Sequence, residues 1–317
     1  MNSKGELLKP LTDAEKTASH VKKTIFRLDT VRKITQFCCF LLLNVAVFSL
    51  GSWPILLPIA QSPGVPHKTV GDAFSALQVM LYEHAFPWLP IASFLLTAVI
   101  LGRALCGWMC PFGFIQDLSG YIKRRHTQVS MRTHEGMINV KYGILAVALF
   151  ISVTLAISLV AGVGQSYESA LGVFAPAPFN ALSPVDTLFP ILPRVVLTVV
   201  YTPEVLIAGI LTDPLLWVRL AIMIATIVLA VYVSRSWCRY FCPIGAALAV
   251  FNRFSFLGLK RDPLRCTRAG CRTCVDACPM MVRILELPWE KFTDPECIYC
   301  LKCVDACPTK ALKPRFP

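Results

Sequence analysis

Eight cysteines near the C-terminus fall into two similar runs. The second run, which ends in Cys307-Pro308, has the spacing Cys-x2-Cys-x2-Cys-x3-Cys-Pro with which bacterial ferredoxins bind [4Fe-4S] clusters. The first run, which ends in Cys278-Pro279, has two extra residues between its first two cysteines. Three closely spaced thiolates can hold three irons of a cubane, and the cysteine before the proline reaches the neighbouring cluster.

This spacing predicts two closed sites with four thiolates each. One set of ligands is Cys266, Cys271, Cys274 and Cys307, and the other is Cys297, Cys300, Cys303 and Cys278. Structural zinc is the alternative, but eight cysteines in a duplicated order argue against it. Sites without an open ligand position suit electron transfer rather than substrate chemistry.

Four more cysteines belong to an internal repeat. Residues 106–113 read CGWMCPFG and residues 238–245 read CRYFCPIG, so both are C-x3-C-P-x-G. In a helix, the Cβ atoms of such a pair lie about 5–6 Å apart, whereas a disulfide needs about 3.5–4.5 Å. Simple packing of small side chains is one interpretation. The other is a further cluster, another metal site or redox-active thiols, formed by Cys106, Cys110, Cys238 and Cys242.

Apolar stretches that could cross a bilayer precede the cysteine runs. The chain has 317 residues, of which 55% are hydrophobic and 16% charged, and its mean hydropathy is +0.60. A bilayer span needs about 20 apolar residues and must be helical to satisfy its backbone. Four stretches meet or approach this length: Ile34–Ile59, Pro87–Leu105, Val140–Val163 and Pro214–Val233.

Lysine and arginine residues indicate the orientation of these spans. The tail before the first span has eight, the region after the fourth has fourteen, and the loop after the first span has only Lys68. Basic flanks stay in the cytoplasm, so both termini are expected there. Val195–Leu211 is interrupted by Pro203 and Glu204 and is expected not to span. The net charge of +12 follows this flanking pattern, and no nucleic-acid partner is expected.

The connections on the opposite side are expected to lie at the membrane surface. Gly162–Pro193 is rich in proline, which favours an irregular cap. Val70–Phe86 is amphipathic enough to lie in the outer interface. The first 33 residues are polar and basic and lack the apolar core of a signal peptide. Cys38 and Cys39, within the first span, are expected to be packing residues.

These features predict an α-helical polytopic membrane protein with four transmembrane helices and a C-terminal cytoplasmic, bacterial-ferredoxin-like α+β domain. The expected location is the inner (cytoplasmic) membrane, where lipid covers the spans. The expected divisions are a basic cytoplasmic tail over residues 1–33, a transmembrane domain over residues 34–253 and a two-cluster domain over residues 254–317.

The combination resembles a known family, the NapH-like membrane-anchored ferredoxin-type proteins. The likeness rests on the four spans, on CGWMCPFG and CRYFCPIGA, and on the two cysteine runs that follow. It extends from the first span to the end of the sequence. The superfamily also includes NosR-type proteins and accessory proteins of cytochrome oxidase assembly. This sequence shows neither the long flavin-binding region expected of the former nor the long domain after the cysteine runs expected of the latter.

The resemblance implies a quinol dehydrogenase component that takes electrons from membrane quinol. The quinone pool would supply the substrate, and the electrons would pass to another iron–sulfur protein, a cytochrome or a terminal reductase. A second hypothesis is an accessory factor that reduces a metal or cofactor during assembly of a metalloenzyme. A third is a redox-sensing regulator, but closed four-cysteine sites argue against the exposed, labile cluster that a sensor needs.

Overall fold

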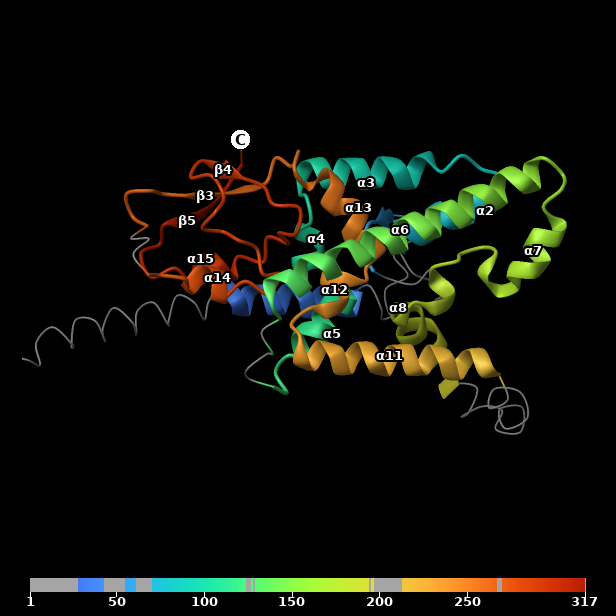
Figure 1. Ribbon diagram of the computed structural model, residues 1–317, viewed down its shortest axis with the longest axis horizontal. Coiled ribbons are helices and arrows are strands. Elements are labelled where there is room, and N and C mark those ends of the chain that lie inside the picture. The colour runs from blue at the N-terminus through green and yellow to red at the C-terminus, as the bar shows by residue number, and fades with distance from the viewer. Residues whose placement is uncertain are drawn as a thin grey trace, which may run out of the picture.

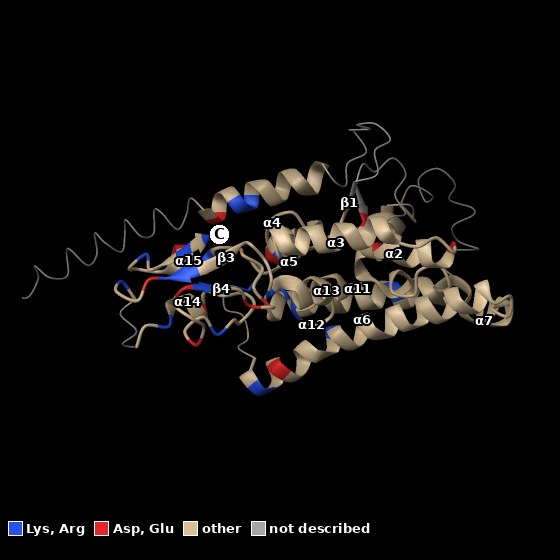
Figure 2. Ribbon diagram, turned by 90° about the horizontal axis from the view of Figure 1, so that it is seen from above, with Lys and Arg blue, Asp and Glu red and all other residues tan. Residues whose placement is uncertain are grey.

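The computed structural model has an apolar helical half and a charged half that carries the cysteine runs. It describes residues 28–42, 55–60, 70–123, 127, 129–193, 195–196, 213–266 and 270–316. Helices run along the long axis at one end, and a small sheet with the cysteine loops forms the other end (Figure 1). Charged residues gather at the sheet end and are rare among the helices (Figure 2).

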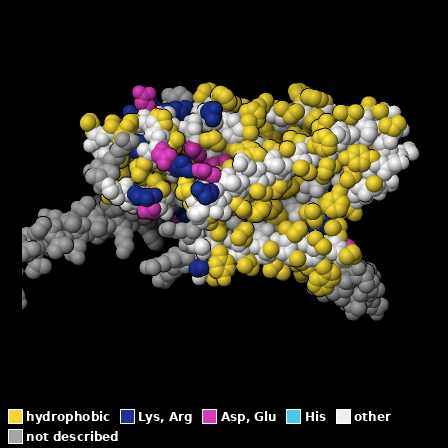
Figure 3. Space-filling model, in the orientation of Figure 1, with side chains coloured by type: hydrophobic (Ala, Val, Ile, Leu, Met, Phe, Trp, Pro, Cys, Tyr) yellow, Lys and Arg dark blue, Asp and Glu magenta, His cyan; other side chains and the backbone are white. Residues whose placement is uncertain are grey.

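Two of the described helices are long and apolar enough to cross a membrane. They are α6 (Met131–Val160) and α11 (Pro214–Tyr232), with 30 and 19 residues. Only 17% and 11% of their apolar windows are buried, whereas a core helix of a soluble protein would be mostly covered. Hydrophobic side chains dominate the visible surface of this half (Figure 3). The outward apolar faces of α6 and α11 are those that lipid contact requires.

The two long helices begin at capping residues. Ser130 precedes α6, and its hydroxyl accepts from the N–H of Thr133 at 3.3 Å. Asp213 precedes α11, and its carboxylate accepts from the N–H of Leu215 at 3.0 Å. These side chains satisfy N–H groups that have no partner within the first helical turn.

The internal repeat forms two copies of the same unit. Each unit consists of a helix, a helix of five residues and a further helix. The first copy is α3 (Trp88–Ile100), α4 (Ala104–Trp108) and α5 (Pro111–Ser119). The second copy is α11, α12 (Ser236–Tyr240) and α13 (Pro243–Asn252). Pro111 and Pro243 begin the last helix of each copy, where proline suits the first helical position. Each copy therefore places its cysteines around the turn between its two short helices.

The helix α3 is shorter than the span expected over Pro87–Leu105. It has 13 residues, which makes it about 20 Å long, against a hydrocarbon core of about 30 Å. The chain turns between α3 and α4 at Gly102, whose φ is +58°. This left-handed backbone ends α3 before Leu105. The expectation of one continuous helix here is therefore wrong.

Two other expected segments lie partly outside the described residues. Of the expected first span, residues 34–42 belong to a helix that is described from residue 28 on, and residues 55–57 form a strand. Residues 43–54 lie outside the described part. Val195–Leu211 also lies outside it, apart from residues 195–196.

Short elements precede α3 and follow α6. Strand β1 (Ile55–Leu57) pairs in parallel with β2 (Val70–Asp72), and α2 (Ala73–Tyr82) follows. Beyond α6 the chain continues through α7 (Gln165–Leu171), η1 (Gly172–Phe174), η2 (Asn180–Leu182), α8 (Pro184–Asp186) and η3 (Thr187–Ile191).

The second half of Gly162–Pro193 is not a surface cap. Phe179 lies against Trp237, with ring centroids 6.2 Å apart, and Val185 and Phe189 are buried. The expectation of an irregular cap is wrong for this part, because its apolar side chains are covered only between the helices. Irregular backbone at this depth is tolerated where protein surrounds it.

The other half of the molecule contains a three-stranded antiparallel sheet in the order β4-β3-β5. Its strands are β3 (Gly258–Arg261), β4 (Lys291–Phe292) and β5 (Leu312–Arg315). The short helices α14 (Thr273–Asp276) and α15 (Lys302–Ala306) pack together and carry Cys274 and Cys303. This small α+β arrangement brings the two cysteine runs side by side.

Candidate metal centres

The four cysteines of the repeat come together at the junction between the two halves, and we name them the repeat group. Cys106, Cys110, Cys238 and Cys242 are each at most 6% exposed. Burial and the nearby thiols of Cys238 and Cys106 raise the pKa of Cys110 to about 12. Burial likewise raises the pKa of Cys238 and Cys242, with further contributions from the neighbouring thiols. Such thiols stay protonated at neutral pH unless a metal replaces the proton.

Cys110 and Cys242 occupy equivalent positions at the starts of α5 and α13. Their φ and ψ values are −61° and 118° for Cys110, and −76° and 114° for Cys242. The Gly245 N–H donates to the sulfur of Cys242 at 3.4 Å. The backbone N–H groups of Gly113 and Ala60 act on Cys110 in the same way. Peptide N–H groups directed at sulfur stabilise a thiolate and tune bound iron–sulfur clusters.

Two buried arginines join the copies of the repeat reciprocally. Arg103 precedes the first motif by three residues, and its Nη2 donates to the carbonyl of Cys238 at 3.2 Å. Arg235 holds the same place before the second motif, and its Nη1 donates to the carbonyl of Cys106 at 2.8 Å. Both arginines are 0% exposed. Each motif therefore binds the arginine of the other, which fixes one pair of thiols relative to the other.

The glycine that ends each motif leaves room for the contact between each arginine and the carbonyl of the other motif. A Cβ on Gly113 would lie 3.1 Å from the carbonyl oxygen of Cys106. A Cβ on Gly245 would lie 3.0 Å from Nη2 of Arg103. The spacing C-x3-C-P-x-G is thus explained to its last residue by close packing around the repeat group.

Asp117 and Glu296 balance the charges of the two arginines. Nε and Nη2 of Arg235 donate to the two carboxylate oxygens of Asp117 at 2.9 and 2.6 Å. Nη1 of Arg103 donates to Glu296 at 2.9 Å. Burial alone would raise the pKa of Asp117, but Arg235 and Arg32 hold it well below its usual range. Breaking a buried pair of this kind costs about 3–5 kcal/mol, so these pairs secure the position of the arginines.

The donor set of the repeat group suits an iron–sulfur centre. Four soft thiols converge in a dry site beside two fixed positive charges, which favours iron or another thiophilic metal. Within the described parts of the chain, no three His, Cys, Asp or Glu side chains are close enough to share one metal ion. Four thiolates are the ligands of a cubane as well as of a structural zinc ion.

A second set of thiols, which we name the buried group, consists of Cys278, Cys297, Cys300 and Cys303. These four cysteines line one cavity. Burial raises the pKa of Cys278 to about 11 and that of Cys297 and Cys303 well above the usual value. Three of the four come from the second cysteine run and one from the first. The structure thus brings together the four residues that the spacing assigns to one cluster.

The third set, which we name the outer group, consists of Cys266, Cys271, Cys274 and Cys307. These cysteines line a separate cavity. The Ala311 N–H donates to the sulfur of Cys307 at 3.3 Å, and hydrogen bonds from Thr273 lower the pKa of Cys271. These hydrogen bonds stabilise the thiolate forms of Cys307 and Cys271. Like the buried group, the outer group combines one cysteine of one run with three of the other.

The repeat group touches the loop that carries the buried group. A Cβ on Gly107 would lie 2.4 Å from the backbone oxygen of Ile298, so the two backbones are in close contact. The indole Nε1 of Trp108 donates to the carbonyl of Tyr299 at 3.0 Å. Both residues lie between the two cysteines of the first motif, and both partners lie between Cys297 and Cys300.

The buried group in turn adjoins the outer group. The thiol of Cys274 contributes to the raised pKa of Cys303, and the helices α14 and α15 that carry these residues pack together. The three sets of thiols therefore lie in series, from the repeat group through the buried group to the outer group.

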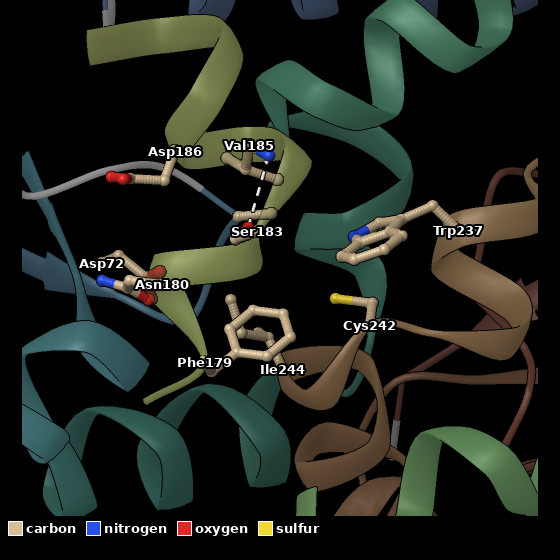
Figure 4. A pocket seen from close by; sticks show the side chains of 10 residues that line it. Asp72, Phe179, Asn180, Ser183, Val185, Asp186, Trp237, Cys242 and Ile244 are labelled. Carbon is tan, nitrogen blue, oxygen red and sulfur yellow. Dashed lines mark hydrogen bonds between the residues drawn. The ribbon is translucent and has the colours of Figure 1, made fainter. Parts of the chain in front are cut away.

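A small cavity lies on the helical side of the repeat group (Figure 4). Cys242 and Trp237 lie on one side of it, and Asp72, Asn180 and Ser183 on the other. The carboxylate of Asp72 caps α2 and accepts from the N–H of Phe74 at 2.8 Å. Burial raises the pKa of Asp72 to about 7. The carboxyl group of Asp72 thus lies across the cavity from Cys242, the member of the repeat group that lines it.

The repeated motif and the two runs identify the cysteines, but they do not include Arg103, Arg235 or Asp72. Extending the repeat by three residues gives R-x2-C-x3-C-P-x-G in both copies, and this would have identified the arginines. No pattern in the sequence identifies Asp72, because its proximity to Cys242 arises only from folding. Cys38 is exposed, Cys39 is half-buried, and both lie outside the three groups.

Two family models match the chain. One, described as a 4Fe-4S binding domain, matches residues 86–129 and 215–262, which include both copies of the repeat. The other, described as a 4Fe-4S dicluster domain, matches residues 258–308, which include both cysteine runs. No solved structure matches the chain.

Several curated proteins are similar in sequence. An uncharacterized protein of Methanocaldococcus jannaschii is 27% identical over 210 residues, 64% of this chain and 68% of that protein. Protein NirI of Paracoccus denitrificans is 27% identical over 67% of this chain and 27% of its own length. Ferredoxin-type protein NapH of Haemophilus influenzae is 23% identical over 57% of this chain and 49% of its own length. The matched region thus spans about half of NapH and about a quarter of NirI.

Proposed function

We propose that this iron–sulfur electron-transfer protein, which fits the NapH-like family of ferredoxin-type proteins, oxidises membrane quinol and passes the electrons to a soluble redox partner. The buried group and the outer group each hold one [4Fe-4S] cluster, and the repeat group holds a further iron–sulfur centre. When bound, these centres supply one-electron steps. The observation that carries the proposal is the serial contact of the three thiol groups from the helical half to the charged half.

The proposed setting is a multi-pass protein of the cytoplasmic membrane with both termini inside. The apolar faces of α6 and α11 support membrane association, and the lysine and arginine residues that flank the apolar stretches support the orientation. In this arrangement the repeat group lies at the inner membrane edge, between the lipid and the two cluster sites.

Quinol oxidation releases two protons with its two electrons, so a proton acceptor is needed near the first centre. Asp72 is suited to this task, because its carboxylate lies across the small cavity from Cys242 and its pKa is about 7. Below that pH the carboxyl group is protonated and cannot accept another proton. Asn180 and Ser183 provide further polar groups at the same cavity.

Asp72→Asn is expected to slow reduction of the protein by a quinol analogue by at least about tenfold, while dithionite reduces it as before. The wild-type rate is expected to fall as the pH drops below about 7, and the variant is expected to lose this dependence. Asparagine keeps the cap on α2, so the helix should form normally. Anaerobic bleaching of the iron–sulfur absorbance measures both reactions. An unchanged rate and pH profile would remove Asp72 from the path, and failure of every quinol analogue to bleach the wild type would refute quinol oxidation.

Arg103→Gln or Arg235→Gln is expected to lower the midpoint potential of the centre in the repeat group. Each change removes a positive charge and takes one cationic partner from a buried carboxylate, which keeps a second one, Lys141 for Glu296 and Arg32 for Asp117. The loss of positive charge favours the oxidised centre. Coulomb's law at an effective dielectric constant of about 20 gives a shift on the order of 100 mV for a one-electron couple. EPR-monitored redox titration measures it. Lysine at either position keeps the positive charge and should return the midpoint potential most of the way to the wild-type value. Arg132→Gln, at the exposed start of α6, should leave the midpoint potential unchanged. A purely structural role would give loss of the signal without a shifted potential.

A further inference from the structure

The sheet of the charged half has two different faces. In the central strand β3, Leu259 and Arg261 are each 1% exposed, whereas Lys260 between them is exposed. Phe292 and Leu312, which pair with Leu259 and Arg261 in the neighbouring strands, are also buried. Because side chains alternate along a strand, these four residues define an inner face and Lys260 belongs to an outer face.

The inner face borders both cluster sites proposed above. Leu259 and Phe292 line the cavity of the buried group. Arg261 and Leu312 line the cavity of the outer group. A single layer of strands therefore separates the outer face from both sets of thiols.

The outer face carries positive charges in register. Lys260 pairs directly with Lys291 on one side and with Lys313 on the other, and Arg315 lies opposite Gly258. Lys291 donates to the carbonyls of Ser255 and Phe256, but no carboxylate within the described residues forms an ion pair with any of the four cations. We name Lys260, Lys291, Lys313 and Arg315 the cationic face; Figure 2 shows its strands on the side turned to the viewer.

The acid that follows β3 does not cancel this charge. Asp262 follows β3, but its carboxylate accepts from the N–H of Leu264 at 3.0 Å and lies 3.5 Å from the guanidinium of Arg265. Lys260 and Lys313 occupy directly paired positions, and both are exposed to solvent. Like charges at such positions repel one another across the ladder, and an anionic surface placed over them would relieve that repulsion.

Protection of the sheet edges explains only part of the pattern. Lysine on an edge strand discourages pairing with another chain, which accounts for Lys291 on β4 and Lys313 on β5. Lys260 lies on the central strand, which has no free edge, and Arg315 adds charge on the same face. The pattern thus marks a surface rather than an edge.

We propose that the cationic face is the docking surface for an acidic electron-transfer protein. The proposal rests on the proposed function, because it needs clusters beneath the sheet. One electron leaves the reduced cluster and reduces one metal or flavin centre of the partner, and no bond forms or breaks. Complementary charge brings the partner to the side of the protein where one strand layer separates it from both clusters, and it accelerates encounter at low salt.

Lipid headgroups are the other anionic surface to consider, and the orientation of the sheet disfavours them. The strand β3 runs in nearly the same direction as α3 in both ribbon views (Figures 1 and 2). The cationic face therefore stands along the proposed membrane normal, and a flat bilayer could meet only its near end. A protein can cover the whole face.

Electron transfer to carriers of opposite charge tests the proposal on the full-length protein in neutral-lipid nanodiscs. Dithionite-reduced protein is mixed with oxidised rubredoxin, which is acidic, or with cytochrome c, which is basic, and cluster reoxidation is followed by stopped flow. Lys260→Glu/Lys313→Glu is expected to slow the rubredoxin reaction at least about tenfold at low salt and to accelerate the cytochrome c reaction. Both differences should vanish at about 1 M salt, where charges are screened within about 3 Å.

Two further variants separate docking from other effects. Lys260→Gln/Lys313→Gln removes the repulsion between the lysines, should fold at least as well as the wild type, and should give intermediate rates. Lys123→Glu/Arg132→Glu makes the same change of net charge, with Lys123 in the connection between α5 and α6 and Arg132 in the first turn of α6. It should leave both rates within about twofold.

Specific outcomes would overturn the proposal. Equal rates in all variants would do so, as would an equal effect of the control pair, which would indicate net charge alone. An effect seen only when the nanodiscs contain anionic lipid would assign the cationic face to the membrane. Iron analysis of the same samples separates these results from failure of the proposed function, since a protein without iron cannot carry clusters at all.

Discussion

Cys278→Ala and Cys303→Ala are expected to remove the same cluster, and Cys307→Ala and Cys274→Ala are expected to remove the other. Each change should lower the iron content by about four atoms per chain and remove one of two distinct EPR signals. The reason is the crossed arrangement of the two runs, in which Cys278 lines the cavity of the buried group and Cys307 that of the outer group. Alanine is used because serine oxygen can replace a thiolate ligand.

Anaerobic iron and sulfide analysis with EPR of the reduced protein measures this outcome. The opposite grouping, in which Cys278→Ala and Cys274→Ala abolish the same signal, would show that each run binds its own cluster. Cys38→Ala provides a matched control, because Cys38 is an exposed cysteine outside the three groups and its loss should leave the iron content unchanged. Zinc in place of iron in the wild type would refute both cluster assignments.

The double variant Cys106→Ala/Cys242→Ala is expected to lower the iron content from about twelve atoms per chain to about eight. It removes one thiol from each copy of the repeat, and the remaining two cannot hold a cluster. Electron entry from quinol should then fall by at least about a hundredfold, because the repeat group lies between the helical half and the buried group. The two [4Fe-4S] clusters should still be reduced by dithionite.

Iron analysis, EPR and quinol-analogue bleaching of the same preparations check this prediction. Cys38→Ala/Cys39→Ala removes two thiols from the described helix of residues 28–42 without touching the repeat group and serves as the control. An iron content of about eight in both wild type and variant would show that the repeat group holds no cluster. Its cysteines would then act as thiols or as packing residues, and the serial path would begin at the buried group.

The sequence determined the chemistry of the cysteine-rich regions. Eight cysteines in two runs, each ended by Cys-Pro, predict which thiols share one cubane, because loop length and the proline turn restrict the choice. The structure places the same two sets of four around two cavities, and the binding of a cluster by each set stays a prediction. The resemblance to NapH-like proteins is confirmed by the matching relatives and family models, because the repeated motif and the runs are local features of the chain.

Hydropathy determined less about the helical half. It predicted α11 and the apolar part of α6, but α6 begins at Met131 rather than at the expected Val140, because its first turns are polar. It could not show that α3 stops at Ile100, or that residues after α7 turn inward to Trp237. An apolar residue contributes the same hydropathy whether it faces lipid or another helix.

Only the tertiary structure decided how the centres are supported and how they connect. The exchange of Arg103 and Arg235 between the copies, the position of Asp72 across from Cys242, and the alignment of Lys260 with Lys291 and Lys313 all join residues distant in sequence. Ligand spacing is a property of a few consecutive residues and can be read along the chain. Buried charge pairs, cavities and strand register depend on which segments meet, and that is settled by the packing of the whole fold.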